Sequence, residues 1–153
     1  MINLISIFLM SPLQVAINNQ QNIIFKLLLL QEFQSQSDKI DVNKRSMKAI
    51  IGEEIEVFER TSLYMSIEKK NIDAIKALLA WEEIDVNEKS FHLSGNTLMD
   101  EKTALYLAVE IGDLGIIKLL LEKKGIDINN EDSQGRKPID YSSDDEVRQL
   151  FSH

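Results

Sequence analysis

Histidine is the side chain that most often exchanges protons near neutral pH, and this chain contains only two, His92 and His153. Neither stands in a credible Ser-His-Asp arrangement, and no glycine-rich phosphate-binding motif occurs. Cysteine is absent, which excludes a catalytic thiol, a disulfide framework and a thiolate metal site. We therefore predict that the protein is not an enzyme and that it has no catalytic residues and no cofactor.

Acidic residues near the carboxyl end have a superficial likeness to a calcium-binding loop. Asp127, Asn129 and Glu131 have the spacing of its first ligands, but the sixth position, which requires glycine, is Asp132. The Asp-x-Asn pair also recurs earlier in the chain, at Asp41 and Asn43 and at Asp85 and Asn87. We therefore expect these side chains to shape turns, and we predict no metal site.

Three stretches of the chain repeat one pattern. Each opens on a small residue and a leucine, at 11–13, 61–63 and 103–105, and closes on Ile-Asp-Val/Ile-Asn, at 40–43, 84–87 and 126–129. Within each stretch, apolar residues at helical spacing predict two short helices, at 13–17 and 23–30, at 63–68 and 72–80, and at 104–111 and 114–123. Thr103 is placed to cap the amino end of its helix, and Gly112 breaks the third pair. Repetition of this kind indicates stacked units that hold partners.

The repeated motifs resemble the ankyrin repeat, whose first helix opens on Thr-Pro-Leu-His-x-Ala. The chain has SPLQVA at 11–16, TSLYMS at 61–66, TALYLA at 103–108 and a shortened KPIDYS at 137–142. The resemblance implies one domain over 1–153, with repeats at about 11–43, 61–87 and 103–129 and a capping repeat at 135–151. It also implies an all-α ankyrin-repeat solenoid with extended β-hairpin fingers. The usual histidine is replaced in every copy, so we expect weaker bracing between the units.

Two insertions separate this chain from a regular repeat array. The segments at 47–58 and 89–99 alternate in polarity around a turn, which predicts two long β-hairpins. One interpretation is that neighbouring hairpins pair and only cover each other's apolar residues. The other is that a partner docks along them, because insertions in repeat proteins gather on one face.

The resemblance implies a surface for binding another protein along the hairpins and the first helices. Aromatic and arginine side chains commonly supply most of the energy of such interfaces. The candidate contact residues are Phe58, Arg60, Glu68, Lys69, Phe91, His92, Lys102 and Glu110. The predicted function is a protein–protein interaction module; the alternatives are inhibition of an enzyme by occlusion and a self-associating scaffold. Trp81 is interpreted as a packing residue.

Charge and hydropathy narrow the range of partners. The formal net charge of -8 argues against nucleic acid, because phosphate binding needs a basic face. The apolar stretch 2–10 is too short to span a bilayer, and we interpret it as a strand or a cap on the end of the stack. We expect a monomer in the cytoplasm or nucleus that does not bind a membrane.

Overall fold

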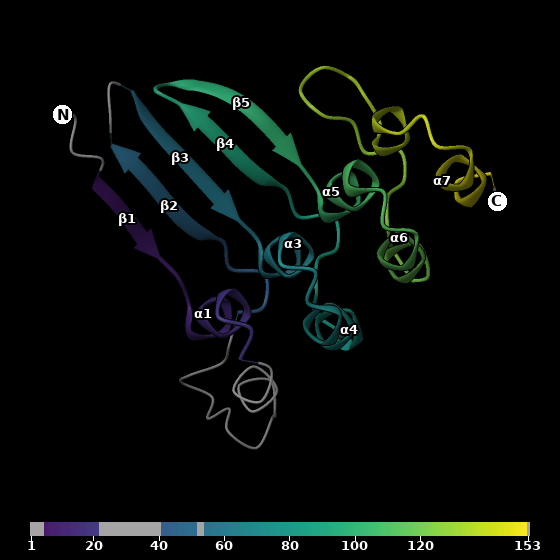
Figure 1. The fold of residues 1–153 in the computed structure, drawn as a ribbon, viewed down its shortest axis with the longest axis horizontal. Coiled ribbons are helices and arrows are strands. Elements are labelled where there is room, and N and C mark those ends of the chain that lie inside the picture. Colours follow the sequence, from purple (N-terminus) through teal and green to yellow (C-terminus); the bar gives the residue numbers. More distant parts are fainter. Residues whose placement is uncertain (1–4, 22–40, 52–53, 153) are drawn as a thin grey trace.

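The computed structural model describes residues 5–21, 41–51 and 54–152. The helix predicted at 23–30 lies outside these residues. Figure 1 shows a twisted sheet on one side of the molecule and two rows of short helices on the other. The strands are seen lengthwise and the helices end-on, so the helix axes stand across the strands.

A five-stranded antiparallel sheet corrects the expectation of an all-α fold. Its strands follow the order of the chain: β1 (Ile5–Leu9), β2 (Ser46–Ile51), β3 (Ile55–Arg60), β4 (Ser90–Ser94) and β5 (Thr97–Lys102). The two predicted hairpins are present as β2–β3 and β4–β5. They do not project as separate fingers, because β3 also pairs with β4 and β2 with β1. This pairing satisfies backbone groups that isolated hairpins would leave open at their edges.

The helices form an inner row beside the sheet and an outer row beyond it (Figure 1). The inner row is α1 (Pro12–Asn18), α3 (Ser62–Glu68) and α5 (Ala104–Ile111), and the described outer row is α4 (Ile72–Ala80) and α6 (Leu114–Leu121). Consecutive inner helices pack on each other, α3 packs on α4, and α5 packs on α6. At the carboxyl end, the 3-10 helix η2 (Pro138–Tyr141) packs on α5, and α7 (Asp145–Leu150) packs on α6. The number and boundaries of the repeats remain a prediction.

The core lies between the two rows of helices. Leu63, Ile75, Leu105, Ile117 and Leu120 are fully buried there. Both helices of a pair are apolar on the faces that meet, as expected for helices stacked between neighbours. Burial of these side chains is the main force that holds the rows together.

Each inner helix begins after a serine or threonine at the N-cap position, and two of these three side chains make the capping hydrogen bond. The side chain of Ser11 accepts a hydrogen bond from the Gln14 amide, and Thr61 accepts one from the Tyr64 amide. Thr103 occupies the corresponding N-cap position of α5, but its hydroxyl makes no capping bond. The predicted cap at Thr103 is therefore correct in position and wrong in its hydrogen bond. Gly112 ends α5 with a left-handed φ of 72°, as its place in the sequence indicates.

The Asp-x-Asn pairs shape turns, as predicted. In each pair the aspartate accepts a hydrogen bond from the amide of the asparagine two residues later. The asparagine then reaches the next unit: Asn43 Oδ1 accepts from the Asp85 amide at 2.8 Å, and Asn87 Oδ1 accepts from the Asp127 amide at 2.8 Å. These side chains therefore link successive units along the stack.

Two of the residues at the position of the usual histidine, Gln14 and Tyr106, still supply bracing hydrogen bonds. Gln14 Nε2 donates to the Lys44 carbonyl at 2.5 Å, and the Tyr106 hydroxyl lies 2.6 Å from the Asn130 carbonyl oxygen. Both side chains thus tie an inner helix to the chain that follows its repeat. The expectation of weaker bracing is wrong at Gln14 and Tyr106, because amide and phenol groups supply the missing donors.

Candidate binding surface

The face of the sheet that looks toward the inner helices carries one continuous row of side chains. Strand register pairs Phe8 with Lys48, Lys48 with Phe58, Phe58 with His92, and His92 with Asp100. Directly opposed residues lie on the same face of an antiparallel sheet, so these five belong together. The Phe58 and His92 rings stack with centroids 4.3 Å apart, and Lys48 Nζ lies 5.4 Å from the Phe8 centroid.

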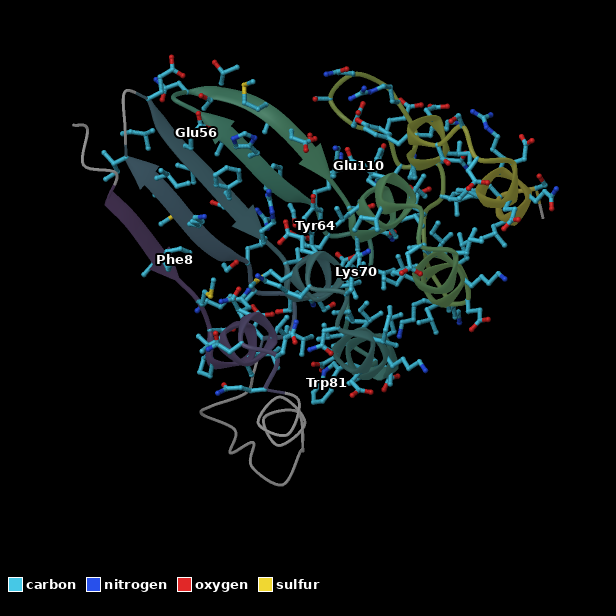
Figure 2. All side chains as sticks on the ribbon, viewed as in Figure 1. Phe8, Glu56, Tyr64, Lys70, Trp81 and Glu110 are labelled. Atoms are coloured by element: carbon cyan, nitrogen blue, oxygen red, sulfur yellow. The ribbon has the colours of Figure 1, made fainter. Side chains whose placement is uncertain are left out.

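Two equivalent ion pairs join this face to the inner helices. Arg60 at the end of β3 pairs with Glu68 of α3 at 3.4 Å, and Lys102 at the end of β5 pairs with Glu110 of α5 at 3.1 Å. Arg60 also donates to the Phe91 carbonyl at 2.7 Å, which connects β3 to β4. Figure 2 shows Glu110 where the sheet meets the helices. These pairs fix the corner between the sheet and the inner row.

A hydrogen-bonded cluster occupies the end of the sheet far from the helices. Glu56, labelled in Figure 2, lies 2.6 Å from His92 Nε2 and accepts from the Ser94 hydroxyl at 2.6 Å. The bonds from Ser94 and His92 lower the pKa of the Glu56 carboxyl. Serine and histidine both bond to the carboxylate and not to each other, so the histidine does not activate the hydroxyl. The cluster therefore has a structural arrangement and not that of a catalytic triad.

The inner groove is the hollow between this face and the ends of α1 and α3. It has a volume of about 330 Å³, and its walls come from the first three strands and the two helices. Its apolar side includes Phe8, Met10, Ile50 and Phe58. Its charged side chains are Lys48, Arg60, Glu68 and Lys69. Aromatic and cationic groups thus meet in one open hollow.

The opposite, outer face of the sheet is largely apolar. Leu9, Ile51, Ile55 and Leu98 are exposed. Arg45 lies over the Phe91 ring at 4.7 Å and forms ion pairs with Glu59 and Glu88. The register also sets Glu59, Phe91 and Glu101 in one row on this face. The charges of that row are paired within the chain, Glu59 with Arg45 and Glu101 with Lys89.

The structure brings together some of the predicted contact residues and separates others. Phe58, Arg60, Glu68 and Lys69 meet at the inner groove. His92 stacks on Phe58, and its side chain is only 27% exposed. Phe91 takes the opposite face in the register of β4, and Lys102 and Glu110 belong to the neighbouring ion pair. Lys102 is only 9% exposed, because Asp100, Glu110 and the Tyr141 ring surround it.

Sequence reasoning missed Phe8 and Lys48. The interpretation of residues 2–10 as a strand or a cap contains the signal for Phe8, because a strand pairing with the first hairpin adds to the same sheet. Its register against β2, which sets Phe8 beside Lys48, has no local sequence signature. Trp81 is partly buried against the core at the end of α4 away from the sheet, in agreement with its predicted packing role (Figure 2).

Metal sites and membrane-spanning helices are both absent from the part of the chain that the structure describes. No group of three or more histidine, aspartate or glutamate side chains there could hold a metal ion. None of the helices in these ranges has the length and apolarity needed to cross a membrane.

Comparison with known protein families gives one match. Residues 100–133, which span the end of β5, both helices α5 and α6 and the following turn, match the family model of the ankyrin repeat. Ankyrin repeats are typically non-enzymatic modules that bind other proteins. A search of curated protein sequences finds no match.

Proposed function

We propose that this chain is a protein-recognition module that binds its partner through the inner face of the sheet and the ends of the inner helices. The observation that carries this proposal is the row from Phe8 to Asp100 on the inner face, of which Phe8, Lys48 and Phe58 line the inner groove. Aromatic side chains and arginine dominate the energetics of protein interfaces, and here they lie in an open hollow. The match to the ankyrin repeat supports the same class of function.

The sheet and the inner helices are held together by contacts within the chain, which suits them for recognition. Ion pairs at Arg60 and Lys102 and the pairing of β3 with β4 fix the corner between sheet and helices. A partner therefore meets a surface that needs little ordering on binding, which reduces the entropic cost of association.

A photo-crosslinking experiment tests this proposal. The photoreactive residue p-benzoylphenylalanine replaces Phe8 on the inner face, or Ile55 on the outer face as a matched position. Both native side chains are exposed and apolar, at 53% and 49%. After irradiation in a lysate of the source cells, we expect a specific protein adduct from position 8 that excess native chain removes. Adducts from position 55 alone would move the site to the outer face, and specific adducts from neither position would contradict recognition through the sheet.

Self-association is the second candidate, and the outer face favours it. Exposed Leu9, Ile51 and Ile55 offer an apolar surface, and among the described strands β1 pairs only with β2. An unpaired apolar edge can pair with a second copy of itself. Light scattering at two protein concentrations tests this candidate, and an unchanged monomer mass at both would exclude it.

A further inference from the structure

The inner groove has an excess of positive charge in a chain that is acidic overall. We propose that the groove binds an extended segment of a partner protein in which an aspartate or glutamate adjoins a large apolar side chain. This inference rests on the proposed function and names the chemistry of the partner.

The positive charge comes from lysines without a counter-ion. Lys48 and Lys69 line the groove, and among the described residues neither has a carboxylate within ion-pair distance. Glu68 is the one carboxylate among the lining side chains, and it already pairs with Arg60 at 3.4 Å. Three cations therefore share one anion, which leaves the groove able to accept a carboxylate.

The neighbouring unit shows that this imbalance is local. There Lys102 occupies the position that corresponds to Arg60, and it contacts both Asp100 at 3.3 Å and Glu110 at 3.1 Å. Its positive charge is neutralised within the chain. At the amino-terminal side of the groove the corresponding strand and helix positions are Met10 and Asn18, which carry no charge. Within the described residues, the inner groove thus combines cations that lack a counter-ion with an uncharged, apolar wall.

The apolar wall of the groove is the reason for the large apolar side chain in the proposed partner segment. Phe8 is 53% exposed, and Met10, Ile50 and Phe58 continue the surface beside it. In the neighbouring unit the position of Phe58 is taken by Asp100, so the same wall is not repeated. A volume of about 330 Å³ suits one or two side chains of a peptide, at the lower end of the range for ligand pockets.

The predicted preference of the groove for a carboxylate is the opposite of the preference that the net charge of the whole chain would give. The net charge of -8 repels acidic partners at long range, and it would by itself select basic ones. Lys48 and Lys69 reverse that preference only within the groove, where a carboxylate can approach within hydrogen-bond distance. An apolar neighbour to the carboxylate is needed because isolated surface ion pairs contribute little.

A peptide selection tests the inference. A phage-displayed library of random hexapeptides is selected on the immobilised native chain, and enriched peptides are synthesised and titrated by fluorescence polarisation. We expect enrichment of Asp or Glu next to Phe, Leu, Ile, Trp or Tyr. Binding should weaken about tenfold or more in the double variant K48E/K69E and persist in K48R/K69R. The matched control K76E/K118E makes the same charge change on exposed positions of the outer helices and should leave the affinity unchanged.

Each outcome decides the inference. Enriched peptides that are basic or uncharged, yet are lost with Phe8→Ser, would overturn the acidic preference and leave recognition at the inner groove intact. No enrichment, or enrichment indifferent to Phe8→Ser and to both lysines, would contradict the inference and the proposed function together. Displacement of the peptide by inorganic phosphate or an oligothymidylate at equivalent charge would also overturn it, because the site would then select anions and not a peptide. Thermal unfolding of every variant controls for loss of fold.

Discussion

At the scale of single residues, the hydroxyl of Tyr106 acts as a brace at a position where the ankyrin-repeat pattern has a histidine. It lies within hydrogen-bond distance of the carbonyl oxygens of Asn130 and Arg136. Burial of the ring raises the pKa of Tyr106 to about 12, so the hydroxyl stays a donor at all ordinary pH. We expect Tyr106→Phe to lower the free energy of unfolding by about 1–3 kcal/mol, because a buried acceptor loses its donor. Urea unfolding measures this change in the free energy of unfolding.

Tyr64→Phe is the matched control, since the Tyr64 hydroxyl has no hydrogen bond among the described contacts. An equal loss of stability in both variants would contradict the bracing role of Tyr106.

The Asp132 carboxylate makes the free energy of unfolding depend on pH in the acidic range. Burial raises its pKa, but hydrogen bonds from the Tyr141 hydroxyl and from the Arg136 and Gln134 amides outweigh this and lower the pKa to about 2. A depressed pKa means that the carboxylate stabilises the fold above its unfolded pKa, near 4, and loses that contribution as pH falls toward 2. Asp132→Asn should therefore cost on the order of 1–2 kcal/mol at pH 7, after allowance for solvent screening, and almost nothing near pH 2. Urea midpoints at pH 7, 4 and 2.5 give the comparison, and a constant difference across this range would exclude the linkage.

At the scale of elements, asparagine side chains link one Asp-x-Asn turn to the next. Asn87 accepts from the Asp127 amide and donates to the Gly125 carbonyl, both at 2.8 Å, so its removal breaks two bonds between units. We expect Asn87→Ala to cost about 1 kcal/mol, a modest value because the bonds are exposed. Asn129→Ala provides the comparison, since the Asn129 side chain bonds only to Lys137 Nζ among the described contacts. Equal stabilities of the two variants in urea would show that the link between units contributes nothing.

Some of the secondary-structure elements could be predicted from the sequence alone, but the pairing between them could not. The helices of the second and third pairs and both hairpins could be predicted because helical spacing, strand alternation and turn residues are local signals. The pairing of β3 with β4 could not, since it depends on how two separated segments meet when the helices stack. The same limit applies to the site: Phe58 and Arg60 were identifiable by residue type, whereas Phe8 and Lys48 join them only through strand register. Thr103 occupies its predicted N-cap position but lacks the capping bond, which the residue type and position do not by themselves determine.

At the scale of the whole molecule, the hairpins belong to the framework as well as to the surface. Hairpins that projected as separate fingers could be shortened with little effect on the free energy of unfolding, because stacked repeats are stabilised by the interfaces between neighbouring units. In the observed sheet, removal of β2–β3 would leave β1 without its partner among the described strands, and β4 would keep only β5. Point substitutions on the inner face are therefore the appropriate way to separate recognition from folding.

A substitution at Leu120 tests whether the stacked helices, and not the outer face of the sheet, supply most of the stability. It is fully buried in α6, within the core that joins the two rows of helices, whereas Ile55 is an apolar residue of the sheet that is half exposed on the outer face. We expect Leu120→Ala to lower the free energy of unfolding by about 2–5 kcal/mol, through lost burial and the cavity that remains. Ile55→Ala should cost less than about 1 kcal/mol, since little buried contact is lost. Because stability in stacked repeats comes from interfaces between neighbours, the Leu120 variant should also lose binding when it unfolds, while the Ile55 variant should keep it. Urea unfolding with far-ultraviolet circular dichroism gives both values. The opposite ranking would mean that the sheet, and not the stacked helices, is the main source of stability.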